Sequence, residues 1–394
     1  MVEKNGILDI FCGPGGFSLG FKQAGFDIIY SSDINESAIE TITYNHNKIA
    51  ECTKEQNHHC AEIMDITKIN KEKCGEIKSH FEKNEYRIQG IIGGPPCKGF
   101  SISNSRTRTL DNPHNSLFKD YIKLVKHFDP DFFAFENVPG IKSMGGGKII
   151  DEIKEELHTN LGYTLGMKTL NASDYGVPQN RRRVIIIGVK PEKIKTQYVK
   201  EDRLDMELIF PKNDDMPKIT VGEAINDLPM IGNGNKEEIM SYPSFKLSKY
   251  ANLMRKTPDL KMESSAVFNH VNSKNGDTVL KRYENISEGG NWRDIPEDLL
   301  TNYKDKSRCH SGIYKRLRSD VPSGTINNIR KSMYIHPLQN RGLSVREAAR
   351  IQSFPDWYEF KGSLNAQQQM VADAVPPLLA KAIAEQIKKI IIDN

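Results

Sequence analysis

The chain has 394 residues, more than one hydrophobic core usually serves, so we expect one large domain and a smaller one. Its hydrophobic content of 38% and charged content of 27% are those of an ordinary globular protein, and no apolar run approaches the roughly 20 residues that span a bilayer. The net charge of +4 does not by itself indicate nucleic-acid binding, and six widely spaced cysteines favour free thiols in a reducing compartment over a disulfide framework.

The first half of the chain alternates predicted strands and helices. Strands are expected over residues 6–11, 27–31, 90–92, 132–135 and 184–189, and helices over 17–25, 38–44 and 117–127. This alternation predicts a Rossmann-like α/β fold, a mostly parallel sheet with helices on both faces. Ligands of such sheets bind beyond the carboxyl ends of the strands, where we also place the polar and glycine-rich segments of this half.

A glycine-rich turn follows the first predicted strand, in residues 9–17, which read DIFCGPGGF. Glycines allow the backbone to approach a ligand closely, but the spacing is not the GxGxxG of dinucleotide-binding proteins. Asp33 ends the next strand, where a carboxylate accepts hydrogen bonds from a ribose or caps the following helix. The residues alone favour neither role for Asp33.

The segment 93–101, GGPPCKGFS, is more specific. Two prolines stiffen the loop before Cys97 and present its thiol rather than bury it. A cysteine attacks as the thiolate, and a neighbouring cation such as Lys98 favours that form. A small buried thiol is the usual fate of a lone cysteine, but a Gly-Gly-Pro-Pro loop is a poor place to bury one, so we interpret Cys97 as a nucleophile.

Two further segments carry candidate catalytic groups. Glu136 ends an apolar strand, where a carboxylate acts either as a capping group or as a site acid. Gln179, Arg181 and Arg183 alternate, so on an extended segment their side chains share one face.

The composition changes after Lys190. Residues 190–308 are polar and weakly periodic, which predicts a second domain whose elements the sequence does not define. Helical periodicity returns over 343–353 and 376–392. Basic clusters stand at Arg181-Arg182-Arg183, at Lys315, Arg316 and Arg318, and at Arg341, Arg346 and Arg350. Each is a phosphate-binding patch or a solvated face, and for any single cluster we favour the solvated face.

Taken in order, these segments resemble the motifs of the DNA (cytosine-5) methyltransferase family of bacterial restriction-modification systems. The glycine turn resembles the first motif, and residues 93–101 resemble the catalytic loop. Residues 136–138 match the ENV motif, and residues 179–183 match Q-x-R-x-R. Residues 337–353 and 374–377 resemble the ninth and tenth motifs. The likeness covers about the first half and the last fifth of the chain. Chance does not explain why these motifs all occur in the family's order.

The resemblance implies a catalytic mechanism. Cys97 would add to C6 of a flipped-out cytosine, Glu136 would bind or protonate N3, and Arg183 would position the base, with Arg181 close by. Lys98, Ser101, Asn137 and Gln179 are implied to act on the DNA or to orient the catalytic loop. The fold implied for the large domain is that of an S-adenosylmethionine-dependent methyltransferase.

The resemblance also implies the S-adenosyl-L-methionine site. Phe11 would stack on the cofactor, the three glycines would make room for it, and Asp33 would bind its ribose. The full set expected to bind the cofactor is Phe11, Gly13, Gly15, Gly16, Asp33, Ile34, Asp65, Ile66, Pro95, Leu117 and Asp373. Two departures bear on these roles, because the family usually has Gln in place of Lys98 and Gly-Asn in place of Ala372-Asp373.

Another group of polar residues, Cys52, His58, His59, Cys60 and Cys74, contains two types of zinc ligand. Their spacing is irregular and includes no C-x-x-C pair, so we favour an inserted surface loop and expect no metal.

The predicted organisation has four parts. Residues 1–190 would form the catalytic and cofactor-binding domain, 191–315 the target-recognition domain, 316–365 the hinge and ninth motif, and 366–394 the return to the large domain. Double-stranded DNA is the expected partner of a cytoplasmic monomer that does not associate with membranes. A cognate restriction endonuclease, not physically bound, is a further expectation.

Other functions remain open at this point. One branch of the family methylates a tRNA cytosine on the same scaffold, although the long segment between the arginine motif and the ninth motif favours a DNA reader. A catalytically inactive DNA-binding protein is disfavoured because Cys97, Glu136, Arg181 and Arg183 are all present. A dinucleotide oxidoreductase is a distant alternative.

Overall fold

The computed structural model describes residues 4–96, 117–200, 203–204, 206–212, 217–300, 312–327, 329–330 and 333–392. A seven-stranded sheet with the order β3-β2-β1-β4-β5-β7-β6 forms the centre of the large domain. The strands are β1 (Lys4–Ile10), β2 (Asp27–Asp33), β3 (Cys60–Ile63), β4 (Tyr86–Gly93), β5 (Phe132–Asn137), β6 (Thr164–Asn171) and β7 (Arg182–Val189). Within the described residues, none of the helices is both long enough and apolar enough to span a membrane.

The sheet is parallel from β3 to β5 and antiparallel at β7. Because β7 runs the other way, its first residues lie beside the last residues of β5, with Asn137 opposite Val184 and Glu136 opposite Ile185. The strand predicted over 184–189 is therefore present, but it brings the arginine motif to the active edge by its amino end.

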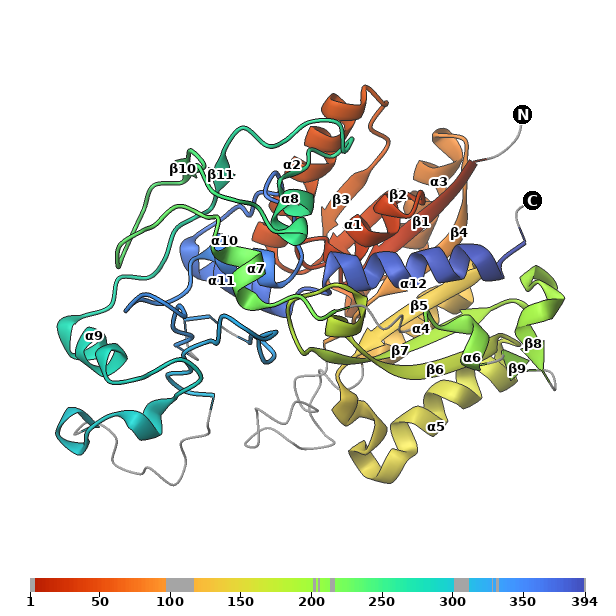
Figure 1. Ribbon diagram of the computed structural model, residues 1–394. Helices are drawn as coiled ribbons and strands as arrows, with labels where there is room; N and C mark the ends of the chain where they lie inside the picture. The colour runs from red at the N-terminus through yellow and green to blue at the C-terminus, as the bar shows by residue number, and fades with distance from the viewer. Residues whose placement is uncertain are drawn as a thin grey trace.

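Strand residues alternate between two apolar layers, as the period of a strand buried on both faces requires. On β5, Phe133 and Phe135 face one layer and Phe132 and Ala134 the other. The first layer holds α3 (Lys71–Lys83), α4 (Leu117–Phe128) and α5 (Lys148–Lys154), and the second holds α1 (Gly16–Gln23) and α12 (Pro377–Ile390). Figure 1 shows α12 along one face of the sheet and α5 below the opposite one. Helices thus cover both faces, which confirms the predicted fold class.

Two glycines let α1 and the C-terminal segment pack at close range. A Cβ on Gly20 would lie 2.4 Å from the Cβ of Ala380 and 2.5 Å from the Pro377 carbonyl oxygen. A Cβ on Gly16 would lie 2.1 Å from the carbonyl oxygen of Val375. The end of the chain therefore completes the layer that the first helix begins.

The rest of the chain is built from short elements. They are β8 (Val199–Lys200), β9 (Arg203–Leu204), α6 (Met206–Ile209), α7 (Val221–Ile225), β10 (Ile239–Met240), α8 (Lys249–Arg255), β11 (Val267–Phe268), α9 (Asp277–Glu284), α10 (Val345–Ile351) and α11 (Leu364–Asp373). Helix α2 (Glu36–Thr53) contributes Ala38 and Ile49 to the core that α7, α8, α10 and α11 share. Figure 1 shows β10, β11 and α9 on the side of the molecule away from both termini.

One-turn helices complete the described secondary structure. The 3₁₀ turns are η1 (Ile66–Lys68), η5 (Pro139–Lys142), η6 (Met144–Gly147), η8 (Ala172–Tyr175), η9 (Pro191–Lys193), η10 (Thr196–Tyr198), η11 (Trp292–Asp294) and η12 (Glu297–Leu300). A π-helical turn, η7 (Glu155–Asn160), continues α5.

Buried arginines tie the ninth-motif helix to the second domain. Arg350 pairs with Asp227 at 2.8 Å and with Asp356 at 2.6 Å, and all three side chains are buried. Arg341 pairs with Glu347 at 2.6 Å. The guanidinium of Arg346 donates to the carbonyl oxygens of Phe268, Pro355 and Tyr358. The prediction that this cluster forms a solvated face was wrong, because its side chains are buried and bind carboxylates and carbonyl oxygens inside the protein.

Candidate active site

Register aligns the predicted motifs along one edge of the sheet. Ile10 lies beside Ser32 on β2 and Gly93 on β4, and Gly93 lies beside Phe135 on β5. The segments that follow these strands therefore emerge in a row, about 4.8 Å apart per strand. Together with the start of β7, they place the glycine turn, the entry to the cysteine loop at residues 94–96, the ENV segment and the arginine motif at one edge.

At the β5–β7 end of this row, Glu136 and Arg183 form an ion pair. The Arg183 Nε lies 2.7 Å from the Glu136 Oε1, and both side chains are nearly buried. The other carboxylate oxygen faces Gly94, where a Cβ would stand 3.1 Å from Glu136 Oε2. Gly94 therefore keeps space free in front of the carboxylate, at the start of the cysteine loop.

Asn137 holds the loop that leads to the predicted nucleophile. Its side-chain amide donates to the carbonyl oxygen of Pro95 at 3.1 Å and is buried. This contact fixes the entry to the loop relative to Glu136. Cys97, Lys98 and Ser101 themselves lie outside the described residues.

The backbone of the glycine turn has an unusual conformation at Phe11, the residue that follows β1. Phe11 has a φ of 60°, a left-handed conformation that costs a non-glycine residue about 1–2 kcal/mol. Strain of this kind gathers at ligand-binding sites. Gly13, with a φ of 51°, has open space where a Cβ would stand, so this part of the turn is accessible.

Gly15 and Gly16, which are expected to make room for a cofactor, have atoms of the protein itself where their Cβ atoms would stand. A Cβ on Gly15 would lie 2.6 Å from the hydroxyl oxygen of Tyr358, which itself donates to the Pro14 carbonyl oxygen at 2.5 Å. The space above Gly16 is filled by Val375. Both glycines therefore accommodate the ninth- and tenth-motif segments of the protein itself.

Asp33 joins the second strand to the glycine turn. Its carboxylate accepts from the Gly13 N–H and from the Asn35 N–H, each at 2.9 Å. Burial raises the pKa of Asp33. The next residue, Ile34, is 70% exposed, an unusual position for a large apolar side chain beside a half-buried carboxylate.

The remaining residues expected at the cofactor lie around this edge. Asp65 caps η1 by accepting from the Thr67 N–H at 3.1 Å and is followed by buried Ile66. Hydrogen bonds from Thr67 lower the pKa of Asp65. Leu117 begins α4 and packs against the sheet. Asp373 ends α11 exposed and accepts from Gln369 at 2.7 Å.

Two buried groups near the turn, Asp9 and Cys12, were not predicted from the sequence. Burial raises the pKa of Asp9 to about 7, and Ser18 donates to one of its oxygens. Burial also raises the pKa of the Cys12 thiol well above its ordinary value, which makes Cys12 a poor nucleophile. An acidic residue inside an apolar strand was the only available signal for Asp9.

Gln179 and Arg181 do not lie with Arg183 in front of Glu136. Both side chains are buried, and they contact Ile326, in the segment that precedes the ninth motif. Burial lowers the pKa of Arg181 to about 9. Of the three residues predicted to share a face, Gln179 and Arg181 thus bind this segment, and Arg183 pairs with Glu136.

A family model described as C-5 cytosine-specific DNA methylase matches residues 6–389. The chain belongs to this family. It is accordingly a DNA (cytosine-5) methyltransferase, an enzyme, and the edge described above carries the family's motifs.

Related proteins agree with this assignment. The type II methyltransferase M.DdeI of Desulfomicrobium norvegicum is 35% identical, over 97% of this chain and 88% of its own. The type II methyltransferase M1.HphI of Haemophilus parahaemolyticus is 34% identical, over 97% of this chain and 86% of its own. A solved structure from E. coli, described as a DNA modification methyltransferase encoded within a prophage, superposes with a TM-score of 0.74 at 27% identity, covering 98% of this chain and 99% of the other.

In this methyltransferase the cysteines and histidines weighed as zinc ligands have other surroundings. The ring of His59 stacks on His46 at 3.6 Å between centroids, and His58 contacts Asn84 at 2.9 Å. Cys74 is buried on α3. No cluster of three or more potential metal ligands occurs in the portions of the chain that the structure describes.

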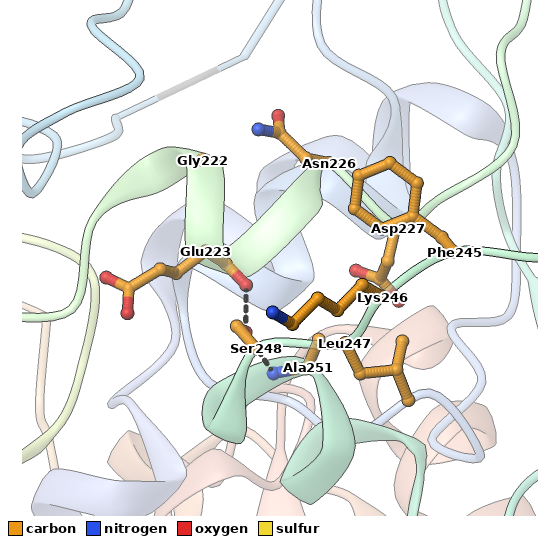
Figure 2. Close-up of a pocket in the computed structure, with 9 residues that line it drawn as sticks. All are labelled: Gly222, Glu223, Asn226, Asp227, Phe245, Lys246, Leu247, Ser248 and Ala251. Carbon is orange, nitrogen blue, oxygen red and sulfur yellow. Dashed lines mark hydrogen bonds between the residues drawn. The ribbon is translucent and has the colours of Figure 1, made fainter.

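A separate hollow of about 300 Å³ lies between α7 and α8 of the methyltransferase. Figure 2 shows its lining, with Ser248 bridging to the Glu223 carbonyl oxygen and to the Ala251 N–H. The residues around it are Gly222, Glu223, Asn226, Asp227, Phe245, Lys246, Leu247, Ser248 and Ala251. The residues predicted for catalysis and cofactor binding are absent from this set.

Proposed function

We propose that this methyltransferase transfers a methyl group from S-adenosyl-L-methionine to C5 of a cytosine within a specific double-stranded DNA sequence. The observation that carries the proposal is the Glu136–Arg183 pair, 2.7 Å apart, beside the Gly94–Pro95 entry to the Cys97 loop. A carboxylate and a guanidinium at this edge, with a thiol in the loop that begins beside them, are the groups needed to activate a pyrimidine ring.

The residues at the β1–β2 end suit the cofactor. Gly13 faces open space, Phe11 stands in a strained conformation beside it, and exposed Ile34 offers an apolar surface for an adenine. Asp33 is the candidate partner for the ribose hydroxyls, and Asp65 for the adenine amino group. When bound, the cofactor supplies a methyl group on a sulfonium, which is strongly electrophilic.

Cys97 is the proposed nucleophile. Carbon C5 of cytosine is too weak a nucleophile to take the methyl group unaided. When the thiolate adds to C6, the C5–C6 electron pair shifts toward C5 and N3, and C5 becomes nucleophilic. After methylation a base, or a water molecule, removes the C5 proton, and the C6–S bond breaks to release the thiolate. Lys98 would favour the thiolate form.

Glu136 and Arg183 would stabilise the charge that this addition produces. A proton or hydrogen bond from Glu136 at N3 offsets the negative charge that develops there, and Arg183 would orient the base at O2. The ion pair holds both groups in place before the base arrives, so little reorganisation is needed during the reaction.

The base has to leave the helix to reach this edge, which costs a few kcal/mol. We propose that residues 191–315 read base edges and contact phosphates, that 316–365 form the hinge, and that 366–394 return to the large domain. We further propose that the protein acts as a monomer and that a cognate endonuclease, not bound to it, cleaves the unmethylated sequence.

The test measures transfer of label from S-adenosylmethionine to mixed duplex DNA and, separately, to tRNA. A duplex with 5-fluorocytosine serves as a trap, because fluorine at C5 cannot leave as a proton and the covalent adduct persists. The control is Cys97→Ser, which should still bind DNA. Label in duplex DNA, with an adduct that requires Cys97, supports the proposal.

Two other results would redirect it. Label in tRNA alone would identify an RNA enzyme on this scaffold. Label in neither, with DNA binding intact, would identify an inactive or partner-dependent DNA-binding protein. Wild-type turnover by Cys97→Ser would remove that residue from its role.

A further inference from the structure

The segments 178–181 and 323–326 lie side by side and join the arginine motif to the proposed hinge, residues 316–365. The Ser323 N–H donates to the Pro178 carbonyl oxygen at 3.0 Å, and the Asn180 N–H donates to the Ser323 carbonyl oxygen at 2.8 Å. The Thr325 hydroxyl donates to the Asn180 carbonyl oxygen at 2.8 Å. We call this set of contacts the hinge ladder.

The side chain of Gln179 extends the ladder to a third segment. Its Oε1 accepts from the Ile326 N–H at 3.0 Å, and its Nε2 donates to the Ile351 carbonyl oxygen at 3.4 Å, at the end of α10. Gln179 is fully buried. One amide thereby connects the arginine motif, the hinge segment 323–326 and the end of α10.

Arg181 binds the carbonyl group of the same residue. Its Nη1 donates to the Ile326 carbonyl oxygen at 3.3 Å, and its Nη2 donates to the Asp373 carbonyl oxygen at 3.4 Å. The backbone N–H and C=O of Ile326 are therefore both held by side chains from the segment that leads into β7. A rigid connection at this point transmits the position of the hinge segment 323–326 to β7.

The next alternate residue on this segment is Arg183, which pairs with Glu136. Side chains two apart on an extended chain point the same way, so a shift of residues 179–181 along or away from the ladder carries Arg183 with it. A displacement of about 1 Å in a catalytic group lowers rates substantially.

We propose that Gln179 and Arg181 are positioning residues that fix the hinge segment 323–326 relative to the Glu136–Arg183 pair. Their contacts set the fraction of bound duplexes in which the target cytosine reaches Glu136. The inference rests on the proposed function, since it concerns delivery of a flipped base to that site.

The experiment compares wild type and Gln179→Glu on two duplexes. One carries the target cytosine paired with guanine, and the other carries it opposite an abasic site, which removes most of the cost of extruding the base. Gln179→Glu keeps the shape and an acceptor for the Ile326 N–H but loses the donor to the Ile351 carbonyl. We expect kcat/KM to fall about tenfold or more on the paired duplex and less than about threefold on the other. The Kd for S-adenosylmethionine should stay unchanged.

Asn269→Asp is the matched control. Asn269 is also a buried amide that bridges backbone, donating to the Phe360 carbonyl oxygen at 3.0 Å and accepting from the Phe360 N–H at 2.9 Å. It makes no contact with residues 178–183 or 323–326 among its described hydrogen bonds. We expect this variant to lower Tm while changing the rates on both duplexes by the same factor.

Each outcome bears on a different claim. Equal losses on both duplexes with Gln179→Glu, or no loss at all, would overturn the positioning role. Failure of the wild type to methylate either duplex would instead overturn the proposed function, and the positioning role with it. If the abasic duplex also restored the rate of Asn269→Asp, the loss in Gln179→Glu would reflect a general loosening of the fold rather than a positioning role.

Discussion

At the scale of single residues, the same side chain serves different purposes within one motif. Arg183 pairs with Glu136 at the edge of the sheet, whereas Arg181, two residues earlier, is buried against backbone carbonyls. Sequence alternation predicted a shared face but could not show what its residues meet, because the partner of Arg181, Ile326, lies 145 residues away. The identity of a motif residue was therefore predictable, while its contact was not.

Glu136→Gln tests the assignment of the carboxylate at this scale. The substitution keeps the size of the side chain but removes the charge that pairs with Arg183 and the proton carried to N3. We expect kcat to fall by roughly 10²–10⁴, the usual contribution of general acid–base catalysis. Isothermal titration should give an unchanged Kd for the cofactor.

Glu152→Gln is its control, since Glu152 pairs with Lys119 on the surface of the same domain. That variant should keep wild-type turnover. A Glu136→Gln enzyme with unchanged kcat would exclude the carboxylate from the chemistry.

At the scale of elements, periodicity predicted most of the sheet and its covering helices. The strands over 6–11, 27–31, 90–92, 132–135 and 184–189 are all present as β1, β2, β4, β5 and β7. The direction of β7 was not predictable, because a buried strand reads alike in both orientations. Strands β3 and β6 were missed, since their half-exposed residues lack a continuous apolar run.

The glycines of α1 show a second limit at this scale. Gly15 and Gly16 belong to a motif associated with cofactors. Because they have no side chains, however, they also leave room for Tyr358 and Val375. A glycine needed for packing cannot be told from one needed for a ligand until the opposing segment is known. That segment is over 300 residues away in the sequence, as the Tyr358–Pro14 hydrogen bond shows.

Gly20→Ala measures how tightly α1 and α12 pack. The new methyl group would meet the Cβ of Ala380 and the Pro377 carbonyl, and we expect a loss of about 1–3 kcal/mol in the free energy of unfolding from overpacking. Denaturation by urea gives this value.

The matched control is Gly75→Ala on α3, where a Cβ would meet no atom within 4 Å. Alanine is favoured over glycine inside a helix, so this variant should gain about 0.5–1 kcal/mol. Equal effects at the two sites would contradict the close packing.

At the scale of the whole molecule, buried charges as well as apolar contacts join α7 and α8 to the ninth-motif segment. Asp227, which follows α7, receives Arg255 from α8 and Arg350 from α10. Asp356 binds Arg350 and the hydroxyl of Tyr242. This core could not be predicted from the polar middle of the sequence, because the apolar residues there are scattered among short irregular segments.

Arg350→Met should show how much this network contributes. Removing the guanidinium leaves Asp227 and Asp356 buried with fewer partners, and losses of about 3–5 kcal/mol are usual for one half of a buried ion pair. The free energy of unfolding is the quantity to measure.

Arg318→Met provides the comparison, since Arg318 pairs with Asp320 in solvent, where an ion pair adds little to stability. If Arg350→Met costs no more than Arg318→Met, the network does not hold α7 and α8 to α10.

The stability of the fold should also depend on pH through the stacked histidines. Burial lowers the pKa of His46 to about 3 and that of His59 well below its ordinary value of 6.5. Between about pH 6.5 and pH 3 the unfolded chain therefore binds protons that the folded chain does not. Their contribution to stability is complete above pH 6.5 and is lost as the pH falls.

Asp9 has the opposite effect on stability over part of this pH range, because burial raises its pKa in the folded protein from 3.8 to about 7. Urea titrations of wild type and of His46→Asn/His59→Gln at several pH values separate the two effects. The wild type should lose more stability between pH 7 and pH 5 than the variant. Parallel curves would rule out the histidines as the cause, and His127→Gln, an exposed position on α4, should resemble the wild type.

The position of α12 has a consequence for how the chain is made. A ribosome releases the amino end first, so β1 and α1 emerge long before Pro377–Ile390, the helix that covers their apolar face. Until α12 has been synthesised, Phe17, Phe21 and the neighbouring sheet residues lack this cover. We expect the nascent β1–α1 region to need a chaperone or to stay incompletely folded until that helix emerges.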